Sequence, residues 1–85
     1  MDADGDPALV TMYSTTWCGH CLRLKRQLDA AGIAYTEVDL DEHPEPTPRI
    51  MRATGGFRTV PTLEIGGALY VNPSLEQVKQ ALVTT

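Results

Sequence analysis

The chain has 85 residues, which is enough for one small domain and leaves little room for a second. Hydrophobic residues make up 42 % and charged residues 21 % of it, values that are ordinary for a soluble globular domain and argue against global disorder. The formal net charge of −4 speaks against sequence-independent binding to nucleic acid. No apolar stretch approaches the roughly 20 residues of a membrane-spanning helix, and the acidic start lacks the features of a signal peptide. We therefore expect a cytosolic protein that does not enter a membrane.

Charge is distributed unevenly along the chain. Residues 1–7 are acidic and end at Pro7, so we expect a flexible tail there and a single domain over residues 8–85. Further along, a basic band runs from Arg23 to Arg26 and an acidic band from Glu37 to Glu45. Both bands are interpreted as solvated faces, because charge alone assigns them no partner.

The first half of the domain has the pattern strand, helix, strand. Residues 9–14 are apolar and β-branched, which predicts a buried strand. From Cys18 to Ala31 the spacing becomes helical, and Gly32 stands where a left-handed helix stop belongs. The buried stripe of this helix is expected to hold Cys21, Leu24, Leu28 and Ala31. Residues 34–40 predict a second strand, parallel to the first because a helix connects the two.

The second half predicts a helix, a hairpin and a last helix. Prolines fit the first turn of a helix, so a short helix is expected from about residue 45–48 to Ala53. Gly66-Gly67 separates two strands, 62–65 and 68–71, as in a tight hairpin. A capping box of Ser74 and Gln77 opens the last helix, with Leu75, Val78 and Leu82 facing inward. The order β-α-β-α-β-β-α predicts an α/β fold, a four-stranded mixed sheet flanked by three helices, and resembles the minimal thioredoxin arrangement.

Cys18 and Cys21 are the only cysteines, and they enclose Gly19-His20. A disulfide across so short a loop restricts the unfolded chain little and would therefore add little stability. A chemical role explains the pair better than a structural one. Cys18 is expected at a helix N-terminus, where free N–H groups and the helix dipole stabilise a thiolate. Cys21, one turn later, lies within reach of a disulfide. This predicts thiol redox chemistry, with Cys18 as nucleophile and Cys21 as resolving thiol.

Two metal-binding alternatives remain open for this motif. A zinc site is disfavoured because the chain adds only His20 and His43 to the two cysteines, and an iron–sulfur cluster bridging two chains is the other candidate. We assign no metal ligands.

His20 either tunes the thiolate by partial positive charge or is a plain exposed histidine. Trp17 either shields the sulfur and contacts a partner or only packs.

Thr59-Val60-Pro61 supplies a possible second half of the site. Pro61 immediately precedes a predicted strand, where its missing N–H is tolerated, so its role can be only to mark the start of that strand. The functional interpretation is a cis peptide between Val60 and Pro61 that turns the Val60 backbone groups outward. Those groups could then hold an extended thiol peptide by strand-like hydrogen bonds.

Taken together, these segments resemble a glutaredoxin-type redoxin over residues 8–83. Segment by segment, the mycoredoxins of actinobacteria are the closer resemblance, through residues 17–25, 58–62 and 72–74. The resemblance implies thiol- and substrate-binding roles for Trp17, His20, Arg58, Thr59, Val60, Pro61 and Asn72. Glutathione-using glutaredoxins typically carry Pro-Tyr or Pro-Phe between the cysteines, and a Gly-Gly with an acidic residue at the last helix. This chain has Gly19-His20 and Asn72-Pro73-Ser74 instead, which places the glutathione carboxylate site in doubt.

This resemblance implies a monomeric thiol–disulfide oxidoreductase that reduces mixed disulfides between client proteins and mycothiol. Mycothiol would be its co-substrate, no cofactor would be bound, and NADPH would act indirectly through mycothiol disulfide reductase. One alternative is a redoxin reduced directly by thioredoxin reductase and serving ribonucleotide reductase. The other, from a different class, is an iron–sulfur cluster carrier.

Overall fold

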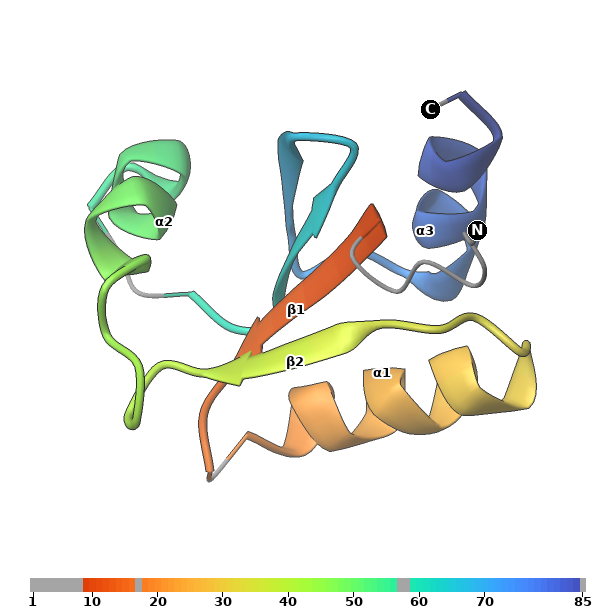
Figure 1. Cartoon of the computed structure of the whole chain (residues 1–85), viewed down its shortest axis with the longest axis horizontal. Helices are drawn as coiled ribbons and strands as arrows, with labels where there is room; N and C mark the ends of the chain where they lie inside the picture. Colours follow the sequence, from red (N-terminus) through yellow and green to blue (C-terminus); the bar gives the residue numbers. More distant parts are fainter. Residues whose placement is uncertain (1–8, 17, 57–58, 85) are drawn as a thin grey trace.

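The computed structural model describes residues 9–16, 18–56 and 59–84, so the expected tail at 1–7 lies outside the described residues. Within these ranges the chain forms four strands and three helices around one mixed sheet of order β2-β1-β3-β4 (Figure 1). The elements are β1 Val10–Ser14, α1 Gly19–Ala30, β2 Thr36–Asp39, α2 Thr47–Thr54, β3 Thr62–Ile65, β4 Ala68–Val71 and α3 Leu75–Thr84. The fold class and the element order expected from the sequence are confirmed.

The register of the sheet joins its two halves at Tyr13. This residue of β1 lies opposite Val38 in the parallel pair with β2 and opposite Thr62 in the antiparallel pair with β3. β4 completes the sheet as the antiparallel partner of β3. The β3–β4 turn is made by Gly66 and Gly67 with φ of 58° and 88°, a left-handed backbone that glycine adopts without steric cost.

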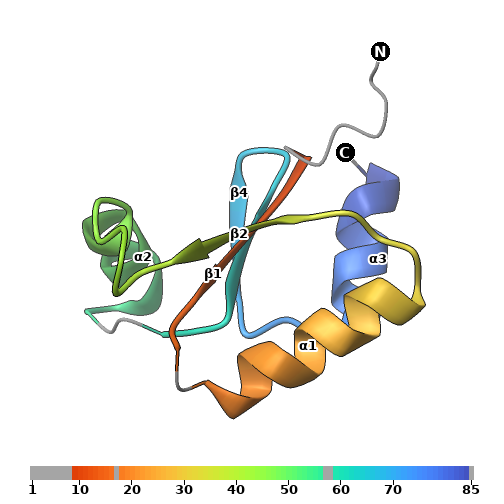
Figure 2. The ribbon, with the colours of Figure 1, turned by 60° about the horizontal axis from the view of Figure 1, so that its bottom comes forward.

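The helices cover both faces of the sheet. Figure 1 and Figure 2 show α1 and α3 on one side and α2 on the other. The α1–α3 side holds the larger core cluster, in which Leu24 and Leu28 of α1 and Val78 of α3 pack on sheet residues such as Met12 and Leu63. Ile50 of α2 packs with Tyr13 and Leu40 on the other face. No helix of the described residues is long and apolar enough to cross a membrane.

Sequence periodicity missed a few boundaries. Ala31 is exposed, because α1 ends one residue earlier and Gly32 turns the chain away at φ 72°. Leu9 is exposed and precedes β1, which begins at Val10. In α3 the expected inward face is confirmed: Val78 is buried, and Leu75 and Leu82 are partly buried and pack against the core, which Ala81 also joins. The second strand, expected over residues 34–40, covers only Thr36–Asp39. These differences displace the ends of elements by one or two residues and leave the element types correct.

A charged cluster ties α2 to the sheet. Arg49 of α2 forms an ion pair with Glu64 of β3 at 3.0 Å, and the Tyr13 hydroxyl donates to the same carboxylate at 2.8 Å. The hydrogen bond from Arg49 lowers the pKa of Glu64 against the opposing effect of burial. Burial first, and the contact with Glu64 second, raise the pKa of Tyr13. At neutral pH the cluster therefore holds an ionised carboxylate between a cation and a neutral phenol.

Replacing Arg49 with methionine is expected to lower the free energy of unfolding at neutral pH by about 1 kcal/mol. The folded-state pKa of Glu64 lies below its ordinary value of 4.5, so the stability it contributes is present above that value and is lost as pH falls through the folded pKa. The gap between wild type and Arg49→Met therefore closes as the pH falls below 4.5. Urea unfolding of both proteins at pH 7 and pH 3 measures this difference in the free energy of unfolding. Lys79→Met, which removes an exposed 4.0 Å pair with Glu76, is the control, and an equal loss in both variants would contradict the assignment.

Candidate active site

Cys18 and Cys21 lie where β1 leads into α1. Cys18 is the N-cap of α1 with an extended backbone, and its Sγ accepts a hydrogen bond from the Cys21 N–H at 3.0 Å. The two cysteines form a disulfide with their Cα atoms 5.2 Å apart. Cys18 is half-buried, whereas only 2 % of Cys21 is exposed. An external thiol can therefore approach the Cys18 sulfur and finds the Cys21 sulfur covered.

The N-cap position gives the Cys18 sulfur its chemical character. The Cys21 N–H is one of the helix N–H groups that have no intrahelical partner, and it already points at this sulfur. When the disulfide is reduced, the same N–H and the helix dipole stabilise negative charge on Cys18. The geometry thus favours a thiolate at the accessible sulfur.

Thr59, Val60 and Pro61 form the second part of the candidate site. Thr62 pairs with Tyr13, so these residues lie at the end of the sheet from which β1 leaves for α1. Figure 1 and Figure 2 both show the segment leading into β3 beside this end of β1. The Val60–Pro61 peptide is cis, as the functional interpretation of the sequence expected. Val60 is half-buried and Pro61 is buried, and the Thr62 hydroxyl donates to the Thr59 carbonyl at 2.6 Å.

His20 of α1 and Asn72 of the loop before α3 lie in the same region. The Asn72 N–H donates to the Pro61 carbonyl at 2.7 Å, and Asn72 itself is left-handed with φ 49°. A groove of about 400 Å³ runs from exposed His20 to Asn72. Its other lining residues are Arg23, Leu24, Gln27, Pro73, Ser74, Leu75 and Gln77. The structure thus brings two of the sequence-predicted residues, His20 and Asn72, into one groove.

Some residues of this groove were not expected as site residues. Arg23 and Gln27 follow His20 at helical spacing of three and seven, so the signal was present in the sequence once His20 was placed. Ser74 and Gln77 were expected only as a capping box, which is confirmed by the Ser74 N–H to Gln77 bond of 2.8 Å and the Gln77 N–H to Ser74 bond of 3.1 Å. The predictions for Trp17 and Arg58 lie outside the described residues.

The other flank of the site is acidic. The Ser14 hydroxyl donates to Glu37 at 2.7 Å, and Thr16 donates to Asp39 at 3.0 Å. The Asp41 backbone N–H, and with it the Thr16 hydroxyl, lowers the pKa of Asp39. These bonds attach the segment just before Cys18 to β2 and keep an ionised carboxylate beside it. A hollow of about 480 Å³ on this flank is lined by Thr15, Thr16, Lys25, Glu37, Asp39, Glu42 and His43.

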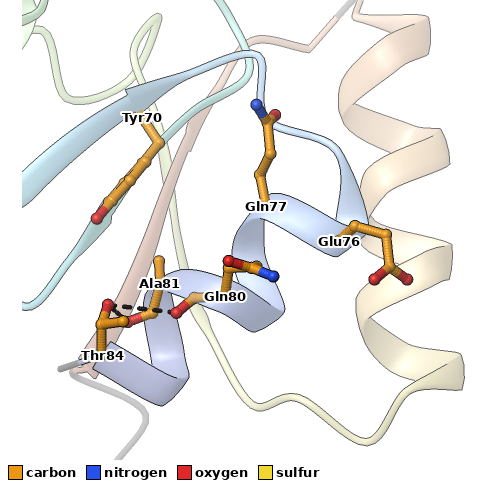
Figure 3. A pocket seen from close by; sticks show the side chains of 6 residues that line it. All are labelled: Tyr70, Glu76, Gln77, Gln80, Ala81 and Thr84. Carbon is orange, nitrogen blue, oxygen red and sulfur yellow. Dashed lines mark hydrogen bonds between the residues drawn. The ribbon is translucent and has the colours of Figure 1, made fainter.

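A separate hollow of about 500 Å³ lies between β4 and α3 (Figure 3). It is lined by Tyr70, Glu76, Gln77, Gln80, Ala81 and Thr84. The Thr84 hydroxyl closes one end by donating to the carbonyls of Gln80 and Ala81 at 3.2 and 3.1 Å. None of the thiol- or substrate-binding residues expected from the sequence lines this hollow, so we do not assign it to the redox site.

Metal-binding groups are a separate question for a pair of cysteines. In the part of the chain that the structure describes, no three His, Cys, Asp or Glu side chains gather in a group that could hold a metal ion.

Comparison with known proteins adds independent information. Residues 10–70 match the family model described as Glutaredoxin. A protein of Mycobacterium tuberculosis that carries the provisional name of glutaredoxin is 46 % identical over 77 residues, 89 % of this chain and 92 % of that protein. Mycoredoxin 1 of Corynebacterium glutamicum is 34 % identical over 70 residues, covering 81 % of this chain and 86 % of its own length. The crystal structure of a buckwheat glutaredoxin–glutathione complex superimposes with a TM-score of 0.69 at 28 % identity, over 89 % of this chain and 74 % of that one.

Proposed function

Because the chain belongs to the glutaredoxin family and is a glutaredoxin-like thiol–disulfide oxidoreductase, we propose that it reduces mixed disulfides between client proteins and mycothiol. The observation that carries the proposal is the asymmetry of the cysteine pair. The half-buried Cys18 sulfur sits at the N-terminus of α1, and the Cys21 sulfur is buried behind it.

The reaction is an exchange of sulfur–sulfur bonds. The Cys18 thiolate attacks the mycothiol sulfur of the mixed disulfide, which forms a Cys18–mycothiol bond and releases the client as a thiolate that takes up a proton. A second mycothiol thiolate then attacks this intermediate, freeing Cys18 and forming mycothiol disulfide. Alternatively, Cys21 attacks the Cys18 sulfur, releases mycothiol and forms the Cys18–Cys21 disulfide. An NADPH-dependent reductase returns the mycothiol disulfide to the thiol, so this chain needs no bound cofactor.

The surroundings of Asn72 support mycothiol over glutathione. Mycothiol ends in a sugar–inositol unit that is rich in hydroxyls and has no carboxylate, whereas glutathione carries two carboxylates. At the start of α3 the N–H groups of Ser74 and Gln77 are already engaged by the capping box, and Glu76 adds a negative charge to the first turn. A carboxylate would find few free donors here. The neighbouring Asn72, Gln27 and His20 offer polar groups suited to hydroxyls.

The substrate-binding roles follow from the same region. We propose that the backbone of Val60, between Thr59 and the cis Pro61, holds the peptide-like part of the thiol by strand-like hydrogen bonds. We assign His20 and Asn72 to the mycothiol sugar, because both line the groove beside the cysteines. Both sulfurs belong to one chain, so a monomer suffices. We place the reaction in the cytosol, where small thiols keep protein thiols reduced.

A coupled assay of NADPH consumption tests the choice of electron donor. One client–mycothiol mixed disulfide and its glutathione counterpart are offered with mycothiol and its reductase, with glutathione and its reductase, or with thioredoxin reductase alone. We expect turnover with the mycothiol system only. Turnover with thioredoxin reductase alone would leave Cys18 in place and replace the proposed donor, and equal turnover with glutathione would contradict the argument from α3.

A further inference from the structure

The outer face of α1 is open beside the disulfide. A shallow hollow of about 460 Å³ on this face is lined by Gly19, Leu22, Arg23, Arg26, Gln27 and Ala30. Gly19 directly follows Cys18, so one end of the hollow lies next to the residue that carries the accessible sulfur. Figure 1 and Figure 2 show α1 at the edge of the molecule, with no other element over its outer side. We call these six residues the α1 face.

Leu22 gives the α1 face an apolar centre. It directly follows the buried Cys21 in the helix, yet 47 % of it is exposed. The other stripe of the same helix, with Leu24 and Leu28, is fully committed to the core. An exposed leucine one turn from a reactive sulfur is available to anchor a partner, since burying its remaining apolar surface is favourable.

Two cations flank this leucine. In the part of the chain that the structure describes, Lys25, Arg49 and Lys79 each pair with a glutamate, whereas Arg23 and Arg26 take part in no ion pair. The chain as a whole carries −4. Its unneutralised arginines on α1 therefore form a local positive region on an acidic protein, next to the redox site.

The opposite flank of Cys18 has the opposite sign. Thr16, two residues before Cys18, hydrogen-bonds Asp39, and Glu42 lines the same hollow. The charge on the two sides of the accessible sulfur thus changes from positive, on α1, to negative, beyond β2. Such a pattern orients a charged partner as it approaches and disfavours the reversed orientation.

We propose that the α1 face docks an acidic segment of a protein partner, rich in Asp and Glu, that lies next to the partner's reacting disulfide. Arg23 and Arg26 attract the acidic side chains, Leu22 packs against an apolar one, and the partner's disulfide is brought to Cys18. The inference uses the redox site but does not depend on which small thiol the protein uses. It makes charge around the client cysteine a determinant of which disulfides are reduced quickly.

Two synthetic peptides test this inference. They are identical except that the residues flanking a single cysteine are Glu in one and Gln in the other, and each cysteine carries thionitrobenzoate as a mixed disulfide. The Cys18 thiolate of the pre-reduced protein attacks the peptide sulfur, forms a Cys18–peptide disulfide and releases coloured thionitrobenzoate; Cys21 then displaces the peptide thiol. The measured quantity is the ratio of second-order rate constants, Glu peptide over Gln peptide.

We expect the wild type to prefer the Glu peptide by about tenfold at low ionic strength, and this preference to shrink as salt screens the charges. Arg26→Glu is expected to abolish or reverse the preference. Lys79→Glu makes the same change of charge on an exposed position of α3 and is expected to keep it. Leu22→Ser is expected to slow both peptides by a similar factor.

Equal rates for the two peptides in the wild type would overturn the proposal, as would a preference that survives Arg26→Glu. Faster reduction of a third peptide with Lys at the flanking positions would assign docking to the acidic flank instead, and would also overturn it. If Arg26→Glu does not fold, as judged by circular dichroism, the neutral variant Arg23→Gln/Arg26→Gln carries the same comparison. In that variant the preference for the Glu peptide is expected to disappear.

Discussion

Replacing Cys18 with serine is expected to abolish turnover of mixed disulfides, whereas Cys21→Ser is expected to retain it and to lose only dithiol activity. The reason is the position of the two sulfurs. Cys18 is half-buried at the N-cap of α1 and can meet a substrate, whereas Cys21 is 2 % exposed and can reach only Cys18. A serine hydroxyl is far less nucleophilic than a thiolate at neutral pH. The coupled NADPH assay with a mycothiol mixed disulfide measures the first activity, and reduction of a protein disulfide such as insulin measures the second.

Cys18→Ser is expected to leave the start of α1 intact, so a loss of turnover in this variant reports the loss of the sulfur. Serine is among the best N-cap residues, and its hydroxyl oxygen can accept the hydrogen bond that the Cys21 N–H donates to the Cys18 sulfur in the wild type. Thermal unfolding of reduced wild type and of Cys18→Ser is therefore expected to differ little. Residual turnover in folded Cys18→Ser would assign the nucleophile elsewhere, and full dithiol activity in Cys21→Ser would refute the role of Cys21 as resolving thiol.

Local signals were sufficient to predict most of the fold. The parallel pair of β1 and β2 follows from a helix between two strands, and the hairpin follows from Gly66-Gly67, whose positive φ angles the turn requires. Cys18 at the start of α1 follows from the same reasoning, because an apolar strand ends just before a helical stripe begins. These features depend on residues close together in the chain.

Contacts between distant segments were not predictable in this way. The groove beside the cysteines depends on how close α1 comes to the loop before α3, which sets Arg23 and Gln27 near Asn72. The bond from Ser14 to Glu37 and the pair of Arg49 with Glu64 join residues that are 23 and 15 positions apart. Sequence spacing carries no information on such pairs, since it is the packing of helices on the sheet that decides which polar side chains meet.

The packing of α1 on the sheet also supports the second large effect, the loss of stability in Leu28→Ala. Leu28 is fully buried in the core cluster shared by α1, α3 and the sheet. Truncating a buried leucine to alanine costs about 2–5 kcal/mol, because apolar contacts are lost and a cavity remains. A domain of this size has a total stability of about 4–13 kcal/mol, so a large share is at stake. We expect the melting temperature to fall by roughly 10–20 °C or more.

Leu22→Ala is the matched control, since it makes the same chemical change on the same helix. Leu22 is 47 % exposed, so we expect its truncation to change the free energy of unfolding by no more than about 0.5 kcal/mol. Urea unfolding of both variants, followed by far-UV circular dichroism, gives the two values. Equal losses would contradict the burial pattern of α1. At temperatures below the melting range of Leu28→Ala, we expect this variant to keep the wild-type rate of disulfide reduction per folded molecule. The reason is that Leu28 stabilises the helix that carries Cys18 without contacting the sulfur. A loss of stability with an unchanged rate would separate the role of Leu28 in folding from the chemistry at Cys18.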